Sequence, residues 1–467
     1  MGRYSPPGAL FVADIVSATG GRLARPGEGT WSFCTDTREL EDGMVFVALR
    51  GEVHDGHRFV RDALLSGRVG AIVDARSLEE GLDLPEHTAG PVIVVGDTLV
   101  AFGDVAQRFL DLHRVPVAAV TGSVGKTTTR SMLASILRQR GPGLESEGNF
   151  NNRIGVPLTA LRLQPKDTWA VLEMGMSEPG EIAELARIAR PRVRIITEVA
   201  AAHLEFFDGV EQIADAKGEM FGDAGEGDVL IYPLDNPLHA RFPMPEGAER
   251  RSFSLAGSPA AAARVTALED RGPAGSRATF SLPGADGVEV DVPLPGAHQV
   301  HNALAAAAAA LAMGATAAEV TAGLAAVEVP GRRMKVGDVA GVTVLDDAYN
   351  ANPASVAAAL RTLAAFPCRG RRVAAVGDML ELGATGPELH AAVGAQATDL
   401  GLDLLVATGP LMTHAAEAAG IPAVAVPDAA AAGAHLRGWL RPGDVLLLKG
   451  SRGMRMEGVL DALSEES

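Results

Sequence analysis

Cysteine and aromatic residues are both scarce in this sequence. Cys34 and Cys368 are the only cysteines among 467 residues, and they lie far apart. Two distant thiols argue against a disulfide framework and against a cysteine metal site, which fits the reducing environment of the cytoplasm. Aromatic residues make up 4% of the chain. The hydrophobic cores must therefore be built mainly from Ala, Val and Leu.

Long apolar runs and an excess of positive charge are absent as well. No stretch of about 18 uninterrupted apolar residues suggests a membrane span, and the N-terminal residues MGRYSPPGAL lack the apolar core of a signal peptide. The formal net charge of −17 argues against a general nucleic-acid or membrane-surface binder. Anionic substrates are still compatible with it, because a local group of Lys, Arg and Mg²⁺ outweighs distant surface charge.

Three domains are expected from the length. We place them at residues 1–113, 114–329 and 330–467. Strands alternate with helices in all three, which predicts an α/β protein with a central parallel sheet and a doubly wound C-terminal sheet. A hairpin is predicted at residues 278–294, around a turn at 283–287. The predicted central and C-terminal strands are 169–173, 193–197, 229–232, 342–346, 372–376, 404–407 and 445–448.

The strongest motif is a strand, a tight glycine-containing turn and a helix, which read VPVAAV, TGSVGKTTT and RSMLASIL. Gly122 and Gly125 let the backbone turn with its N–H groups inward, and the helix start adds free N–H groups and the positive end of its dipole. Lys126 supplies a charge for the β- and γ-phosphates of a nucleotide, and Thr127 supplies a hydroxyl for Mg²⁺. The turn is shorter than the strict G-x-x-x-x-G-K-[ST] motif. The alternative is a glycine turn that only caps a helix.

Three residues of the second segment carry groups that can bind a metal ion. Glu173 ends a predicted strand and His203 follows the next one, so both belong at the carboxyl edge of the sheet, where ligands of open α/β sheets gather. Lys217 lies in a predicted helix that reads EQIADAKGEM. The alternatives are that Glu173 caps the helix starting near Gly180, that His203 is a structural histidine, and that Lys217 faces solvent.

Eight motifs occur in order along the chain: TGSVGKTTT, GNFNNRIGVPLTALRL, LEMGMSEPGEIAELARIARP, AAHLEFF with IADAKGE, PGAHQVHNALAA, DDAYNANPASVAAAL, GDMLELG and KGSRGMRME. Together they resemble the Mur ligase family of cell-wall synthesis over nearly the whole chain. The phosphate loop is shared with folylpolyglutamate synthases. DDAYNANP, GNFNNRIGVP and EMGM resemble more specifically the branch that adds D-alanyl-D-alanine to UDP-N-acetylmuramoyl-tripeptide.

The resemblance implies a UDP-substrate domain, a P-loop ATPase domain and a Rossmann-like C-terminal domain, in a monomeric cytoplasmic enzyme of peptidoglycan precursor synthesis. It also implies ATP-dependent amide formation. A substrate carboxylate attacks the γ-phosphate to give an acyl phosphate and ADP, and an amine then attacks the acyl carbon and releases phosphate. Because two anions must meet in the first step, Lys126 and Mg²⁺ must neutralise charge during transfer.

When the family's metal ligands are transferred to the matching motif positions, the resemblance implies that Thr127 and Glu173 hold one Mg²⁺. It also implies that Glu173, His203 and Lys217 surround a second. In the family the lysine matching Lys217 is carbamylated by CO₂, which turns a cation into a carboxylate-like ligand, and a partly buried amine would favour this. The residues implied as catalytic are Lys126, Glu173, His203, Lys217 and Arg332. The residues implied for ATP are Gly122, Ser123, Val124, Gly125, Lys126, Thr127, Thr128, His298, Asn302, Arg332 and Asp347.

Some of these nucleotide assignments have alternatives in the neighbouring residues. Arg333 is adjacent to Arg332 and is the alternative residue for binding the phosphates. Asp347 is expected to accept hydrogen bonds from the ribose, with Asp346 as its partner or as a buried structural acid. Gln299 stands where the family's adenine motif usually has Asn, and Pro233 stands where the family has another Asn near the nucleotide. We therefore assign no nucleotide contact to Pro233.

The remaining assignments concern the two substrates. The resemblance implies that an asparagine-rich loop and the residues ahead of Pro353 line the dipeptide or nucleotide pocket. A cationic strand end after residues 445–448 suits the dipeptide carboxylate, and the element TDTR suits the uridine side of the other substrate. Each has an alternative in turn or helix-capping chemistry. The residues are Thr35, Asp36, Thr37, Arg38, Asn149, Asn151, Asn152, Tyr349, Asn350, Asn352, Ser451 and Arg452.

Two other classes of function stay open at this point. One is a related ligase of different specificity, such as a diaminopimelate- or lysine-adding ligase or a folylpolyglutamate synthase. The other is a nucleotide-dependent binding or switch protein without ligase chemistry. The presence of Lys126, Glu173, His203 and Lys217 argues against the switch protein.

Overall fold

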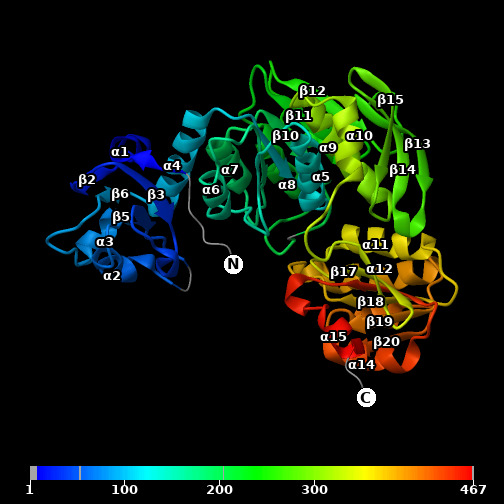
Figure 1. Cartoon of the computed structure of the whole chain (residues 1–467). Helices are drawn as coiled ribbons and strands as arrows, with labels where there is room; N and C mark the ends of the chain where they lie inside the picture. Colours follow the sequence, from blue (N-terminus) through cyan, green and yellow to red (C-terminus); the bar gives the residue numbers. More distant parts are fainter. Residues whose placement is uncertain (1–7, 52–53, 203, 465–467) are drawn as a thin grey trace. The chain divides into compact units, whose positions relative to one another are not determined.

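The computed structural model describes residues 8–51, 54–202 and 204–464. It is an α/β protein with three sheets, which confirms the predicted fold class (Figure 1). No helix within the described ranges is long and apolar enough to cross a membrane. The chain divides into two compact units. The first comprises Met1–Ala119, Gly141–Met176 and Gly180–Arg192, and the second comprises Val120–Arg140, Ser177–Pro179 and Val193–Ser467.

The first unit contains a six-stranded sheet with the strand order β1-β3-β4-β5-β6-β2. Strands β3 to β6 are parallel, and β1 and β2 pair antiparallel at the two edges. The central strands are buried along their whole length, as expected for parallel strands rich in Val and Ile. The strands are β1 (Leu10–Phe11), β2 (Arg22–Arg25), β3 (Thr30–Cys34), β4 (Met44–Val47), β5 (Gly70–Asp74) and β6 (Val92–Val95).

Helices of this unit follow its strands closely. Helix α4 begins at Thr98, where Asp97 accepts hydrogen bonds from the backbone N–H groups of Leu99 and Val100. A parallel pair of strands, β8 (Leu144–Glu145) and β9 (Ala170–Glu173), belongs to the same unit. The helices are α1 (Val12–Thr19), α2 (Val60–Leu65), α3 (Ala75–Glu79), α4 (Thr98–His113), α6 (Gly155–Ala160) and α7 (Glu181–Ala189).

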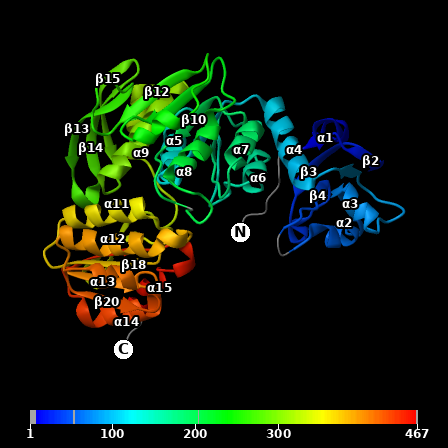
Figure 2. The ribbon, with the colours of Figure 1, turned by 180° about the vertical axis from the view of Figure 1, so that it is seen from behind.

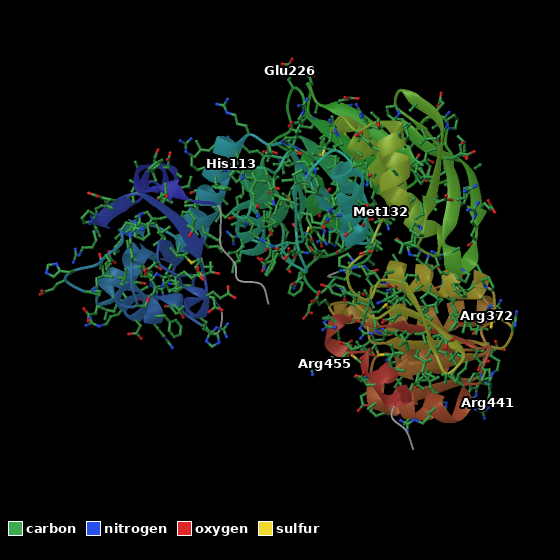
Figure 3. All side chains as sticks on the ribbon, in the orientation of Figure 1. His113, Met132, Glu226, Arg372, Arg441 and Arg455 are labelled. Atoms are coloured by element: carbon green, nitrogen blue, oxygen red, sulfur yellow. The ribbon has the colours of Figure 1, made fainter. Side chains whose placement is uncertain are left out.

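The central part of the second unit is built around the glycine-rich loop. Strand β7 (Val117–Thr121) leads into this loop, and α5 (Lys126–Arg138) follows it. Strands β10 to β13 are parallel neighbours, and β13 to β15 are antiparallel. Helices α5 and α9 lie side by side (Figures 1 and 2), and Met132 is buried within α5 (Figure 3). The elements are β10 (Val193–Ile196), β11 (Val229–Pro233), β12 (Glu249–Ser254), β13 (Ala263–Asp270), β14 (Ser276–Leu282), β15 (Ala285–Val292), α8 (Val210–Gly218), α9 (Ala297–Ala312) and α10 (Ala317–Ala325).

The predicted hairpin is formed by β14 and β15, but the prediction of a turn at residues 283–287 was wrong. Leu282 pairs with Ala285, so the turn consists of Pro283 and Gly284 alone. Gly284 has a φ of +77°, a left-handed conformation that glycine adopts without steric cost. Pro283 at the first turn position and a left-handed Gly284 at the second are the residues that a type II turn requires, so two residues suffice to connect the strands.

The C-terminal part of the second unit is a doubly wound sheet, as predicted. Its order is β16-β17-β21-β18-β19-β20, with only the β16 edge strand antiparallel among the described strands. Helices α11, α12 and α13 pack on one face, and α14 and α15 on the other (Figure 2). The elements are β16 (Lys335–Val339), β17 (Val342–Asp347), β18 (Arg372–Gly377), β19 (Leu404–Thr408), β20 (Ala423–Val426), β21 (Val445–Lys449), α11 (Pro353–Ala365), α12 (Gly386–Asp399), α13 (Thr413–Ala418), α14 (Ala429–Trp439) and α15 (Gly458–Ser464).

Candidate active site

The loop between β7 and α5 has the geometry of a phosphate cradle. Gly122 has a φ of +148°, and a Cβ atom there would lie 2.1 Å from Thr197 Oγ1. Gly125 has a φ of +86°, and a Cβ atom there would lie 2.2 Å from Asn302 Oδ1. Both positions therefore require glycine, for conformation and for space. Because these two residues have no side chain, the backbone N–H groups at the first turn of the 13-residue helix α5 can come close to an anion.

Side chains and backbone groups around this loop hold its shape. Thr197 Oγ1 donates a hydrogen bond to Val124 O at 2.5 Å, and Ser123 Oγ donates to Ala200 O at 2.9 Å. Lys126 Nζ lies across the loop and donates to Gly122 O at 2.6 Å. The residues predicted to cradle phosphate thus form one local structure, which also includes the buried residues Thr127 and Thr128 at the start of α5.

Of the two neighbouring arginines, the structure brings Arg333 to the phosphate loop. Arg333 Nη2 donates to Thr127 Oγ1 at 3.1 Å, and its guanidinium lies 3.8 Å from the ring centroid of Tyr349. Arg332 forms an ion pair with Asp346, with 2.5 Å between Nη1 and Oδ2. Stacking on the tyrosine holds the Arg333 fork in place beside the loop. The assignment of Arg332 to the phosphates stays a prediction, and Arg333 is the better placed of the two.

Lys217 is buried in α8, with 2% of its surface exposed. The alternative that this helical lysine faces solvent is therefore wrong. Burial, together with the positive charge of Lys126, holds the pKa of Lys217 well below its ordinary value. The lysine therefore has a much larger neutral fraction at physiological pH than an exposed lysine, and a neutral amine is the form that reacts with CO₂.

Glu173 and the asparagine-rich loop belong to the first unit. Glu173 is buried at the end of β9, and its Oε1 accepts a hydrogen bond from Asn151 Nδ2 at 3.0 Å. Asn152 Oδ1 accepts from the backbone of residues 154 and 155 at the start of α6, so this side chain is an ordinary helix cap. Asn149 is exposed in the turn before it. His203, the third predicted metal ligand, lies outside the described residues.

The groups at the carboxyl end of the C-terminal sheet are already paired with one another. Asp347 Oδ2 lies 2.5 Å from Lys449 Nζ, and Asp347 Oδ1 accepts from Met334 N at 3.1 Å. Lys449 also donates to Asn350 O at 3.0 Å. Asn352 caps α11, as its alternative predicts, and its Nδ2 also donates to Ser123 O at 3.2 Å. The capping asparagine therefore touches the phosphate loop as well.

The other predicted dipeptide residues occupy different environments. Ser451 is buried, and its Oγ accepts a hydrogen bond from Leu380 N at 2.9 Å. Arg452 is exposed and paired with Glu457 at 2.7 Å. The serine is thus part of a packed strand end, whereas the arginine lies at the surface, and a role of either in binding the dipeptide stays a prediction.

A cavity of about 630 Å³ adjoins the phosphate loop within the second unit. Its wall includes His298 and Asn302 of α9, the two residues predicted for the adenine side of ATP. Gln299 Oε1 accepts from Asn302 Nδ2 at 3.2 Å, so the Gln that replaces the family's Asn orients the neighbouring asparagine. The further wall residues are Val124, Glu198, Ala200, Leu255, Asp270, Gly296, Ala297, His301, Ala354, Ala358, Arg361, Thr362 and Ala365.

Sequence reasoning missed Glu198, which lies on the wall of this cavity, and Asn236, which is bonded to it. Glu198 follows β10 and Asn236 follows β11, and their side chains are hydrogen-bonded to each other. Asn236 Nδ2 also donates to Val199 O at 2.8 Å. Their positions just beyond parallel strands were the available signal, because ligands gather at that edge of an α/β sheet.

The predicted uridine-side element forms a tight turn in the first unit. Asp36 caps the short helix that starts at Thr37, and both its oxygens also accept from Arg38, whose side chain is exposed. These contacts lower the pKa of Asp36 to about 2. Thr35 is half-buried beside them. The structure therefore shows the alternative in which these residues form a turn. A role for them in binding the substrate stays a prediction.

We expect acid to weaken the protein partly through His298. Burial and the charges of Lys449 and Arg361 lower the pKa of His298 to about 4, against 6.5 in the unfolded chain. The unfolded state therefore binds the extra proton first, and stability falls as the pH drops from 6.5 towards 4, by about 1–2 kcal/mol at pH 5. Urea unfolding at pH 7.5 and pH 5 checks this. The His298→Gln variant should lose less stability than the wild type between these two values, and an equal loss would contradict the assignment.

Two family models match the chain. The Mur ligase middle domain matches residues 120–310, and the Mur ligase glutamate ligase domain matches residues 331–452. The UDP-N-acetylmuramoyl-tripeptide–D-alanyl-D-alanine ligase of Escherichia coli (strain K12) is 39% identical over 437 residues, which covers 92% of this chain and 93% of the relative. The enzyme of the same name from Bacillus subtilis (strain 168) is 34% identical, with 97% and 98% covered.

Solved structures give the same result. A crystal structure of MurF from Acinetobacter baumannii has a TM-score of 0.90 at 30% identity and covers 99% of this chain and 100% of that one. MurF from Thermotoga maritima in complex with ADP has a TM-score of 0.81 at 27% identity, with 93% and 97% covered. A folylpolyglutamate synthase of Mycobacterium tuberculosis, with a TM-score of 0.61 at 17% identity over 79% of this chain and 96% of its own, shares the fold alone.

Proposed function

The chain belongs to the Mur ligase family, and from this membership we infer that it joins D-alanyl-D-alanine to UDP-N-acetylmuramoyl-tripeptide at the expense of ATP. The observation that carries the inference is the glycine-only phosphate cradle with Lys126 and Arg333 beside it. The specificity rests on the relatives, which are named for this reaction over more than nine-tenths of the chain. The related ligases of other specificity are therefore not favoured.

The first half of the proposed reaction converts the tripeptide carboxylate into an acyl phosphate, which has phosphate as a leaving group. A carboxylate oxygen of the tripeptide forms a bond to the γ-phosphorus of ATP, the bond to the β,γ-bridging oxygen breaks, and ADP leaves. Lys126 and Arg333 neutralise the charge that builds up when two anions approach. Thr127 and Glu173 are the proposed ligands of a Mg²⁺, which when bound draws negative charge from the phosphate oxygens.

The second half forms the amide bond. The amino group of the dipeptide attacks the acyl carbon, the tetrahedral intermediate collapses, and phosphate leaves with the carboxylate oxygen that was phosphorylated. In the uncharged form the amine has the lone pair that the attack needs. Arg452, exposed just after β21, is proposed to hold the dipeptide carboxylate, together with Tyr349 and Asn350.

Lys217 is proposed to act as a carbamate. Its buried, largely uncharged amine would add CO₂ and lose a proton, so that Nζ carries an anionic carboxylate in place of a cation. With Glu173 and His203 this group is suited to hold a second Mg²⁺, because hard divalent cations prefer oxygen ligands. The support is the burial of the lysine and the role of the matching lysine in the family.

We further propose the three-domain division at residues 1–113, 114–329 and 330–467 and a monomeric enzyme. The first domain would bind the UDP part of the acceptor through the turn at Thr35, Asp36, Thr37 and Arg38. The match to the middle family domain ends at residue 310 and the match to the C-terminal family domain begins at residue 331, which supports the second division.

Arg333 should matter more for catalysis than Arg332. Arg333→Ala removes the guanidinium beside Thr127, and we expect kcat/KM for ATP to fall about 10²-fold or more, in the range seen when one charge-stabilising donor is lost. Arg332→Ala should cost less than tenfold, because its charge is already paired with Asp346. Steady-state kinetics of both variants decide between them. A larger loss in Arg332→Ala would return the phosphate role to that residue.

The proposed function is tested by a direct assay. The purified protein is mixed with ATP, Mg²⁺, UDP-N-acetylmuramoyl-tripeptide and D-alanyl-D-alanine, and the products are identified by mass spectrometry. A UDP-linked pentapeptide that is absent without ATP or without the dipeptide is the expected result. Product formation with a single amino acid but not with the dipeptide would show a ligase of other specificity.

A further inference from the structure

The connection between β10 and α8 is held by the C-terminal part of the second unit. Leu204, in this connection, is half-buried and packs against the apolar core beneath α11, α12 and α13 of the C-terminal sheet. The next residue, Glu205, donates a hydrogen bond from its backbone N to Glu381 O at 3.1 Å. Two segments that are far apart in the sequence therefore meet through an apolar side chain and a backbone hydrogen bond.

The partner segment is the loop at residues 378–385, which joins β18 to α12, and side chains of other elements fix its backbone. Met379 N donates to Nε2 of the fully buried His390 at 2.9 Å. Leu380 N donates to Oγ of the buried Ser451 at 2.9 Å. A buried backbone N–H that loses such a partner is costly, so these bonds hold the loop in one conformation.

The shape of the 378–385 loop is suited to this contact. Glu381 has a φ of +63°, a left-handed conformation that is unfavourable for a residue with a Cβ atom, and its carbonyl is the one that accepts from Glu205 N. Gly383 has a φ of +54°, and a Cβ atom there would lie 3.3 Å from Glu205 Cα. The loop therefore adopts an unfavourable backbone conformation where it meets the connection, and it leaves little space there.

The position of the connection depends on such contacts, because it has no regular structure of its own. Its described residues, 197–202 and 204–209, form no helix or strand. Segments of this kind open locally more easily than helices and strands. Two predicted metal ligands depend on it in the sequence. His203 directly precedes Leu204, and Lys217 lies in α8, which the connection leads into.

We propose that Leu204 is a positioning residue for the ligase reaction. Its packing against the C-terminal core, together with the bond from Glu205 N to Glu381 O, fixes the connection that carries His203 and leads into α8. The proposal rests on the proposed function, since the reaction it serves is ATP-dependent amide formation. Leu204 has no reactive group, but a displacement of about 1 Å at a reacting centre can lower a rate by about 10²-fold.

Hydrogen–deuterium exchange and steady-state kinetics test this together, and the exchange is measured without substrates. Leu204→Ala removes the packing, Leu204→Met keeps most of the apolar volume, and Gly383→Ala places a Cβ atom against Glu205. Leu268→Ala is the matched control for the leucine, because Leu268 is 44% exposed on β13. Gly401→Ala is the control for the glycine, because Gly401 has a φ of +64° but a Cβ atom there meets no neighbour within 4 Å. Melting temperatures identify any variant that fails to fold.

Backbone amides of residues 204–209 should exchange at least about tenfold faster in Leu204→Ala and Gly383→Ala than in the wild type, because the lost packing lowers the free energy of local opening. Amides of the phosphate loop should exchange at the wild-type rate. In both variants kcat should fall about 10- to 100-fold while KM for ATP stays within about threefold. Leu204→Met and the two controls should keep the wild-type kcat within about twofold.

Two results would overturn the proposal and leave the ligase function intact. One is wild-type exchange of residues 204–209 in a folded Leu204→Ala, and the other is faster exchange there with an unchanged kcat. If Leu204→Ala fails to fold, Gly383→Ala carries the same test. A wild type that forms no amide product would instead overturn the proposed function, and with it this role of Leu204.

Discussion

The Lys126→Ala variant is expected to form the amide product at least about 10³-fold more slowly than the wild type. The ammonium of Lys126 lies across the loop, 2.6 Å from Gly122 O, where we propose that the β- and γ-phosphates of a bound nucleotide lie. The proposed first step brings a carboxylate against a triphosphate, and the proposed role of the Lys126 charge is to reduce their repulsion. A loss of 10³ corresponds to about 4 kcal/mol of transition-state stabilisation, the upper part of the range for one charge-stabilising group.

Initial rates of ADP release and of product formation measure this effect. Lys166→Ala is the matched control, because Lys166 is an exposed lysine of the first unit and should leave the rate unchanged. ATP binding by Lys126→Ala should weaken much less than the rate, since most of the cradle is backbone. A variant that is folded by circular dichroism and keeps more than a tenth of the wild-type rate would contradict the assignment of Lys126.

Lys217→Ala should lose at least about 10²-fold in rate and recover part of it when formate, acetate or propionate is added. The side chain is 2% exposed, so truncation leaves a small buried space where the proposed carbamate would lie. A short carboxylate can enter such a space and supply the missing oxygen ligands, because carboxylate oxygens are what Mg²⁺ prefers. A purely structural lysine would not be replaced by a free anion in this way.

The carbamate itself can be observed on the wild type. Protein equilibrated with ¹³C-labelled bicarbonate should give a carbamate carbon signal that is present in Lys166→Ala and absent in Lys217→Ala. Wild-type activity should fall in CO₂-depleted buffer and return on adding bicarbonate. No recovery of Lys217→Ala by carboxylates, together with unchanged wild-type activity without CO₂, would contradict carbamylation.

The parts of the molecule that depend on local sequence could be predicted. The phosphate loop is fixed by two glycines and a helix start within a few residues, and the strand predicted at residues 445–448 is confirmed as β21 (Val445–Lys449). Strand β12 was missed, because it reads ERRSFS and its first half is charged and exposed. Strand β20 was missed because it is a short, partly exposed edge strand. Both segments form strands because they pair with a neighbouring strand, which their own sequences do not indicate.

The parts of the site that depend on tertiary contacts could not be predicted. Sequence spacing cannot choose between Arg332 and Arg333, because the choice is made by the pairing of Arg332 with Asp346 at the end of β17. The burial of Lys217 depends on how α8 packs, which the polar sequence around it does not indicate. Glu198 and Asn236 are 38 residues apart and meet only because β10 and β11 are neighbours.

The central claim is that this site activates a carboxylate by phosphorylation, and an isotope experiment tests it most directly. UDP-N-acetylmuramoyl-tripeptide labelled with ¹⁸O in its terminal carboxylate is turned over with ATP and D-alanyl-D-alanine, and the released phosphate is examined by mass spectrometry. An acyl phosphate requires one ¹⁸O atom in each phosphate released, and the pentapeptide should retain the other. Phosphate free of ¹⁸O, released alongside pentapeptide product, would contradict the account.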